Sequence, residues 1–392
     1  MLRRQFLTGC ACCGLLGRSS TLLAATPGPL PARLERPEPG SDEGGLWSLL
    51  SREEERLKRS RFLLRDGALN AYVARLACRL AGDHCPDIRV YIVRSPFFNA
   101  SMAPNGMLQV WTGLLLRMEN EAQLAAVLGH EIGHYVGRHS LEQLRDAKSR
   151  TALGQFLGMA LGAAGVGAAG SLAQLALLAG MFAYSREHER EADRIGQELI
   201  ATAGYPPIEA AKVWQQLVAE VKAEAEWSGD AGSRSIFFAS HPDPEERSQA
   251  MANRAATMNG DGGDPASAAY AGQIRGHRRQ WLDDELRRRK AGETITLLER
   301  LLRQSDDGET RFFLGEAFRL RAADGDAARA LREYAAAEPR SDCPPEMYRS
   351  RGMLQRQAGD TAAASASFQR YLSLRPDADD AEMIRSYLQE GI

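Results

Sequence analysis

This 392-residue sequence lacks any large excess of positive or negative charge. Its 49 Lys and Arg side chains stand against 51 Asp and Glu, which gives a formal net charge of -2. A chain this close to neutrality has no general attraction for polyanions, so we expect no nucleic-acid partner. The chain is longer than the roughly 250–300 residues that one hydrophobic core serves, so we expect more than one domain.

The N-terminal segment has the features of an export signal. Arg3 and Arg4, followed by Phe-Leu, resemble the twin-arginine signature, and a weakly apolar stretch leads to two small residues. Arg18 interrupts this stretch, so the export route is less well defined than export itself. A lipoprotein box at residues 7–10 and a buried N-terminal helix are the alternatives. We predict a twin-arginine-like signal over residues 1–25 and a periplasmic protein.

Cysteine becomes scarce once this signal is removed, because only three cysteines remain. Cys78 and Cys85 enclose a short loop and can form a disulfide in an oxidising compartment, which leaves Cys343 as a free thiol. Three unpaired structural cysteines are the alternative, and both remain open at this point.

Composition divides the rest of the chain. Residues 26–45 contain five prolines and four glycines, which is typical of a disordered linker. We predict a folded domain over residues 46–252, a second linker over 253–272 and a helical domain over 273–392. In the first domain, β-branched and aromatic runs at 88–93 and 107–111 predict strands, and the Pro-Asn-Gly turn between them predicts a hairpin.

The next predicted helix contains the sequence HEIGH. Asn120 is a suitable N-cap for a helix that runs to about His139. His130 and His134 are four residues apart, so both imidazoles share a helix face and can bind one zinc ion. Glu131 lies about 100° further round the helix, where it can act as a general base on a water molecule that the metal activates.

The third metal ligand must come from another segment. A second helix in SREHEREADRIGQELIATAG carries a charge run that, in isolation, is typical of a solvated face. Within it, Glu189 and Asp193 are one turn apart with the small Ala192 between them. We predict that Glu189 binds zinc and that Asp193 accepts the second N–H of a zinc-bound histidine. His139 is displaced by about 140° from the metal face, and we predict a surface or structural role for it.

HEIGH followed by EREAD resembles the zinc metallopeptidase family that includes the prenyl-protein-processing, membrane heat-shock and mitochondrial inner-membrane stress proteases. The resemblance implies an α+β zincin-like (gluzincin) domain, mostly helical with a small sheet. It also implies one Zn²⁺ per chain on His130, His134 and Glu189, with Glu131 as the base.

Two further segments are similar to segments of this family. NASMAPNGMLQVWTGLL matches the edge strand that pairs with substrate, which implies substrate-binding main chain at Asn99, Ala100, Ser101 and Met102. A Ser-His-Pro element contains His241. This histidine either occupies the fourth zinc position and suppresses activity or donates to the oxyanion during catalysis. A loop histidine without a site role is the alternative.

The C-terminal region repeats itself with a displacement of 37 residues. Gly315, Ala327, Leu331, Tyr334 and Pro339 recur as Gly352, Ala364, Phe368, Tyr371 and Pro376. The pattern predicts an all-α tetratricopeptide-repeat domain, whose concave surface suits peptides or partner proteins. An ordinary helical bundle is the alternative. Repeats and an export signal together narrow the resemblance to periplasmic β-barrel assembly-enhancing proteases.

Residues 151–185 contain no charged residue. A single membrane crossing would separate His130 from Glu189, and two crossings would leave at most 17 residues each, fewer than the roughly 20 that a span needs. We predict a closed helical hairpin that covers the active-site cleft or contacts a membrane surface.

These observations predict a zinc endopeptidase of the cell envelope that cleaves misfolded or stalled outer-membrane proteins. The repeats would recruit those proteins or their assembly machinery. The alternative is a chaperone-like scaffold whose metal site is latent or is held shut by His241. A zinc hydrolase acting on a non-peptide bond is disfavoured, because an edge strand suits an extended polypeptide.

Overall fold

The computed structural model describes residues 30–149, 184–229, 238, 241–258 and 264–389. The first part comprises α1 (Asp42–Arg59), α2 (Gly67–Ala81), the 3-10 helix η1 (Gly82–Asp87), β1 (Arg89–Val93), β2 (Ala100–Met102), β3 (Met107–Trp111), α3 (Thr112–Arg117), α4 (Glu121–Val136) and α5 (His139–Ser149). The second part comprises α8 (Arg186–Thr202), α9 (Ile208–Ser228), α11 (Pro244–Thr257), α12 (Ser267–Arg287), α13 (Ala291–Gln304), α14 (Gly308–Arg321), α15 (Asp326–Ala337), α16 (Glu346–Gln357), α17 (Thr361–Leu374) and α18 (Ala381–Gln389). The expected combination of many helices with one small sheet is confirmed.

The sheet has three strands in the order β1-β3-β2. β1 and β3 are parallel, with Arg89 opposite Met107, whereas β2 and β3 are antiparallel. The turn at Gly106, which has a φ of +84°, therefore joins β2 to β3. The predicted hairpin between 88–93 and 107–111 is wrong, because the short β2 is the antiparallel partner of β3. β2 is an edge strand, as the resemblance implied.

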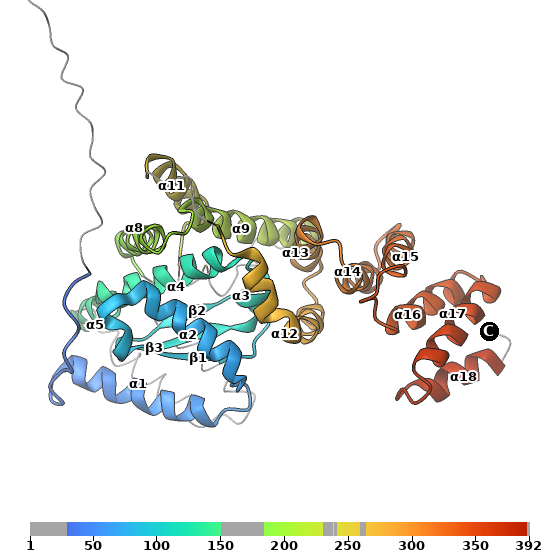
Figure 1. Ribbon diagram of the computed structural model, residues 1–392, viewed down its shortest axis with the longest axis horizontal. Helices are drawn as coiled ribbons and strands as arrows, with labels where there is room; N and C mark the ends of the chain where they lie inside the picture. The colour runs from blue at the N-terminus through green and yellow to red at the C-terminus, as the bar shows by residue number, and fades with distance from the viewer. Residues whose placement is uncertain (1–29, 150–183, 230–237, 239–240, 259–263, 390–392) are drawn as a thin grey trace, which may run out of the picture.

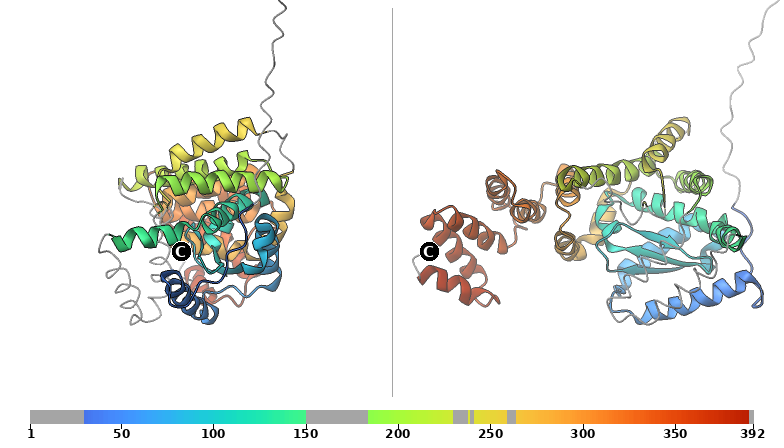
Figure 2. Two further views of the ribbon diagram at one scale, coloured as in Figure 1. Left: turned by 90° about the vertical axis from the view of Figure 1, so that its left-hand side faces the viewer. Right: turned by 180° about the vertical axis from the view of Figure 1, so that it is seen from behind.

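Each face of the sheet packs on different helices. Ile92 and Val110 belong to a large core that includes α2, α4 and α9. Val93 and Trp111 point to the opposite face and form a smaller core with Leu50 of α1. Figures 1 and 2 show α1 on one side of the sheet and α4, α8 and α9 on the other. α4, the helix that carries HEIGH, therefore lies in the interior, between the sheet and the helices α8 and α9.

The N-terminal boundary differs from the expectation of a disordered linker over 26–45. α1 already begins at Asp42, with Ser41 as its N-cap. Before it, Arg33 forms an ion pair with Asp87 at 2.5 Å, and Leu30 and Leu34 pack against the large core. These contacts fix the described part of this segment on the folded domain.

Two further predictions concern the cysteines and the uncharged segment. Cys78 and Cys85 form a disulfide that joins α2 to η1, and Cys343 is a free thiol. The hairpin predicted for residues 151–185 lies almost entirely outside the described residues. No helix in the described part of the chain is both long enough and apolar enough to span a bilayer.

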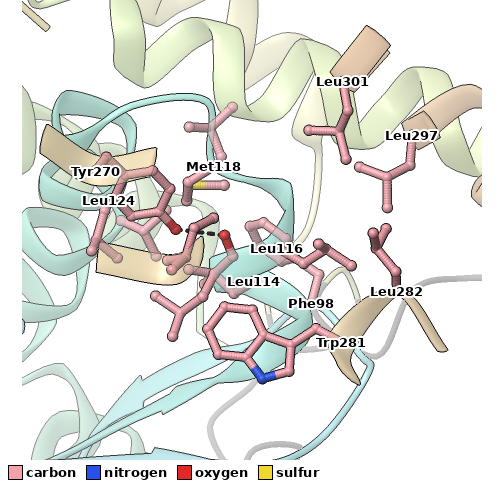
Figure 3. Packing of buried hydrophobic residues seen from close by; sticks show 14 of the residues in the cluster. Phe98, Leu114, Leu116, Met118, Leu124, Tyr270, Trp281, Leu282, Leu297 and Leu301 are labelled. Carbon is pink, nitrogen blue, oxygen red and sulfur yellow. Dashed lines mark hydrogen bonds between the residues drawn. The ribbon is translucent and has the colours of Figure 1, made fainter. Parts of the chain in front are cut away.

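In the second predicted linker, 253–272, most of the described residues are helical. α11 continues to Thr257 and α12 begins at Ser267, and α12 packs on the first domain (Figure 3). Tyr270 is 1 % exposed and donates a hydrogen bond from its hydroxyl to the carbonyl oxygen of Leu115. The two large aromatic side chains of α12, Tyr270 and Trp281, thus extend the core of the first domain towards the C-terminal helices.

Helices α13 to α18 extend away from the sheet (Figures 1 and 2). α14 packs on α15 and α16 packs on α17 as helical hairpins. A Cβ atom added at Gly315 would lie 2.4 Å from the Tyr334 ring, and one added at Gly352 would lie 2.6 Å from the Phe368 ring. The two recurring glycines therefore allow close contact within each hairpin.

Candidate metal centre

The metal centre is built on the close packing of α4 against α8. Asn120 caps α4 by accepting a hydrogen bond from the Gln123 amide at 2.8 Å, as the sequence predicts. A Cβ atom added at Gly133 would lie 2.9 Å from the Cα atom of Ala192, and one added at Gly129 would lie 3.2 Å from that of Gly196. Small residues on both helices therefore bring the two backbones together, which places the α8 carboxylates beside the α4 histidines.

Four buried side chains direct one donor atom each at a common point. His130, His134, Glu189 and His241 form the one group among the described residues that could hold a metal ion, with ligand atoms within 4.8 Å of one another. His130 Nε2 lies 3.1 Å from His134 Nε2 and 3.2 Å from His241 Nδ1. Glu189 Oε1 lies 3.4 Å from His134 Nε2 and 2.9 Å from His241 Nδ1.

These separations fit a tetrahedral zinc site. Ligands at about 2.0–2.1 Å from a tetrahedral ion are about 3.3–3.4 Å from one another. The convergence of imidazole nitrogens and a carboxylate oxygen also suits a cation, which all four donor atoms can bind at once. The donor set of three imidazoles and one carboxylate is one that zinc prefers, and the site has room for one ion.

Asp193 and Arg247 fix the orientation of two ligands. Asp193 Oδ1 lies 3.0 Å from His130 Nδ1, which leaves Nε2 of that ring for a metal. Arg247 donates two hydrogen bonds to Asp193, at 2.8 and 2.7 Å, and also forms an ion pair with Glu189. Burial alone would raise the pKa of Asp193, but Arg247 and His130 outweigh it and lower that pKa to about 2. Both carboxylates therefore stay ionised at neutral pH.

Glu189 has the electrostatic properties of a metal ligand. Burial acts to raise its pKa, but His241 and Arg247 hold the pKa well below the ordinary value for a glutamate. Burial also lowers the pKa of His134 well below the usual value for histidine. A neutral imidazole and an ionised carboxylate are the forms that bind zinc.

His139 is buried, at 1 % exposure, and contacts the site. Its Nδ1 atom lies 2.9 Å from Nδ1 of His134, and its ring stacks on His188. The expected displacement from the metal face assumed one continuous helix, but Arg138 has a φ of +57° and ends α4 before His139. Tyr184 stacks on the ring of His134, at 3.7 Å between ring centroids. The surface location considered for His139 is therefore wrong.

Glu131 lies between the metal centre and the edge strand. Its Oε2 atom accepts a hydrogen bond from the Met102 amide at 3.1 Å. Its Oε1 atom is buried, has no hydrogen-bond partner among the described residues, and is 3.8 Å from His241 Nε2. Burial raises the pKa of Glu131, although His241 and His130 act to lower it. The carboxylate is thus placed beside the convergent donors without being one of them.

Sequence reasoning did not identify Arg247, His139 or Tyr184 as part of this site. Arg247 follows His241 by six residues, in the sequence SHPDPEER, so its closeness to His241 along the chain was a usable signal. Its guanidinium group lies over the ring of Trp214, with 4.5 Å between the guanidinium carbon and the ring centroid. No comparable local signal marks Tyr184, which comes at the end of the uncharged segment.

Comparison with known proteins agrees with this geometry. Residues 63–255 match peptidase family M48. The chain is 31 % identical over 180 residues to the mitochondrial metalloendopeptidase OMA1 of Schizosaccharomyces pombe, covering 45 % of this chain and 50 % of that protein. It is 29 % identical over 255 residues to the β-barrel assembly-enhancing protease of Yersinia pestis, covering 60 % of this chain and 50 % of that protein.

The corresponding protease of Escherichia coli O157:H7 is 28 % identical over 214 residues, covering 52 % of this chain and 42 % of that protein. The chain thus spans half or less of the length of each of these relatives. Peptidases of family M48 depend on zinc, which accords with the His130, His134, Glu189 and His241 cluster. Residues 63–255 are therefore a peptidase family M48 domain.

Proposed function

We propose that this protein is a zinc-dependent endopeptidase of the cell envelope that cleaves misfolded or stalled outer-membrane proteins. The observation that carries the proposal is the convergence of His130, His134 and Glu189 beside a separate buried carboxylate, Glu131. A zinc ion held by these ligands would act as a Lewis acid, which would polarise a substrate carbonyl and lower the pKa of a zinc-bound water molecule. The protein's own residues must then position the substrate and move the proton.

Glu131 is the proposed general base. Its Oε1 atom takes the proton of the attacking water and later delivers it to the leaving amine. Burial acts to raise the pKa of this carboxyl, which favours proton uptake, whereas a bound cation would act to lower it. The hydrogen bond from Met102 to Oε2 keeps the other oxygen directed at the reacting centre.

The edge strand β2 is the proposed substrate-binding element. Asn99 and Ala103 make their main-chain hydrogen bonds to β3, so the main chain of Ala100 and Met102 faces away from the sheet. Met102 directs its amide at Glu131. A substrate that adds to this edge in an extended conformation would therefore run past the base and the metal ligands.

The envelope location and the partners are also proposals. They are supported by the N-terminal export features, the disulfide, and the relatives named for β-barrel assembly. The hairpins α14–α15 and α16–α17 are proposed to act as tetratricopeptide-type repeats that recruit outer-membrane proteins or their assembly machinery.

A second candidate is a chaperone-like scaffold with a self-inhibited metal site. It is favoured by one observation: His241 Nδ1 takes part in the ligand cluster, where it would occupy the fourth zinc position and leave none for water. Cleavage of an unfolded casein substrate separates the two functions. The endopeptidase proposal expects Glu131→Gln or a chelator to reduce cleavage by about 10²-fold or more. Absence of cleavage by the parent would support the scaffold instead, and equal cleavage by Glu131→Gln would show that Glu131 is not the base.

A further inference from the structure

A second hollow lies on the C-terminal helices, outside the metal centre. Residues of α13, α14 and α15 line an open surface cavity of about 600 Å³. This size is within the range of about 300–1,000 Å³ that is common for binding pockets. None of the residues that line it belongs to the peptidase domain that ends at residue 255. None of the metal ligands lines this cavity, so a ligand bound there would not be held by zinc.

The cavity combines an apolar floor with a cationic rim. Ile295, Leu314 and Phe318 form most of the floor and are between 3 % and 7 % exposed. The rim carries four arginines and two glutamates: Arg303, Arg321, Arg329, Arg332, Glu299 and Glu333. The surface is thus positively charged, although the chain as a whole carries a net charge of -2.

Part of this positive charge has no partner within the molecule. Arg303 and Arg332 are exposed, and neither has an ion pair in the ranges that the structure describes. Arg329 is 48 % exposed. Its ion pair with Asp326 is long, at 3.4 Å, and Asp326 also pairs with Arg321. Glu333, one of the two rim glutamates, is already paired with Arg311 at 2.8 Å. Carboxylates of a ligand could therefore pair with these arginines without displacing a strong internal contact.

The cavity continues towards the end of α9. Arg321 lies between two aromatic rings, 5.3 Å from the centroid of Phe318 and 5.0 Å from that of Trp227. Trp227 is 45 % exposed and lines an adjoining pocket of about 150 Å³ together with Arg289 and Lys290. Arg321 lines both hollows, so they are neighbours, and we name the two together the α13–α15 groove.

We propose that the α13–α15 groove binds an acidic segment of a partner polypeptide that also carries large apolar side chains. Carboxylates would pair with Arg303, Arg329 and Arg332, and an apolar side chain would lie on Phe318 or Trp227. The arginines would also suit nucleic-acid phosphates, but a chain with a net charge of -2 has no general attraction for polyanions, so a peptide is the occupant that we propose. This inference rests on the proposed recruiting role of the repeats and defines the chemistry of the segment that they recognise.

Fluorescence anisotropy tests the groove with a labelled short peptide that alternates glutamate with leucine and phenylalanine. The full chain carries Glu131→Gln, so that the peptide is bound and not cleaved. We expect the double variant Arg329→Glu/Arg332→Glu to weaken binding by about tenfold or more, because it places like charges against the ligand. Trp227→Ala should weaken binding several-fold. Both sites are exposed, so the fold is retained.

The control is Arg52→Glu/Arg59→Glu, which makes the same change of net charge on exposed positions of α1. It should bind the peptide as tightly as the parent does. Unchanged binding by the groove variant, equal binding of a peptide with glutamine for glutamate, or equal binding of oligothymidylate would each overturn the inference. Casein cleavage by the chain with an intact Glu131 is measured separately. Peptide binding without cleavage counts against the proposed protease activity, and cleavage without peptide binding counts against the groove.

Discussion

The Nδ1 atom of His139 lies 2.9 Å from the Nδ1 atom of His134. At this distance one nitrogen donates a proton and the other accepts it. When His134 binds a metal through Nε2, its Nδ1 must carry the proton, so His139 must be the acceptor. Burial and the neighbouring His188 both lower the pKa of His139, which favours this neutral form. His139 thus fixes the tautomer of a metal ligand.

Removing His139 should therefore weaken zinc binding. We expect His139→Ala to reduce zinc affinity by about 10–100-fold, the usual effect of losing a residue that orients a metal-bound histidine. Competition with a chromophoric chelator measures this affinity. His277→Ala, on α12 and outside the site, is the matched control and should bind zinc as the parent does. An unchanged affinity in His139→Ala would show that this contact has no positioning role.

Adding a methyl group at Gly133 should disturb the metal site by displacing the backbone of α4. Gly133→Ala would place a Cβ atom 2.9 Å from the Cα atom of Ala192 and push α4 away from α8. We expect a loss of about 1–3 kcal/mol in the free energy of unfolding, together with weaker zinc binding. Gly276→Ala in α12 meets no atom within 4 Å and should instead stabilise the protein by about 0.5–1 kcal/mol. Urea unfolding compares the two, and equal stabilities would contradict the close packing.

Arg117 should contribute strongly to stability because its charge is wholly buried. It pairs with Glu220 at 2.7 Å and with Glu285 at 2.9 Å, and so connects α3 to α9 and α12. Arg117→Met leaves both carboxylates buried without this partner, and we expect it to cost about 3–5 kcal/mol of unfolding free energy. Arg287→Met, which removes an exposed pair with Asp283, should cost less than about 1 kcal/mol. Similar urea midpoints for the two variants would contradict the role of the buried network.

His241 should control turnover. Its Nδ1 atom lies where a fourth zinc ligand would be, so His241→Ala should raise the rate of casein cleavage by about tenfold or more, as a water position becomes free. A decrease of the same size would instead favour the alternative role as an oxyanion donor. A rate equal to that of the parent would make His241 a loop residue without a site role.

The parts of the fold that local sequence patterns determine were predictable. The cap at Asn120, the spacing of His130 and His134, and the end of α8 before Gly204 all depend on residues within a few positions of one another. The proximity of Glu189 to the two histidines followed from combining those two helices with the requirement for a third zinc ligand.

Features that depend on distant pairing were not predictable in this way. Nothing within 88–93 indicates that this strand is parallel to β3 and not its hairpin partner. The sequence around Tyr270 is rich in alanine and glycine and resembles a linker, yet the ring is buried against α3. The position of His139 depends on a single left-handed residue, Arg138, at the end of α4. In each case tertiary contacts decide a structure that local composition leaves open.

The zinc content of the Glu189→Ala protein tests the central claim most directly. In this site a carboxylate of α8, Glu189, completes the ligand set that His130 and His134 of α4 begin. Elemental analysis after dialysis against a weak chelator should find one zinc ion per chain in the parent and in His277→Ala, and far less in Glu189→Ala. Full zinc occupancy in Glu189→Ala, or no zinc in the parent, would contradict the account.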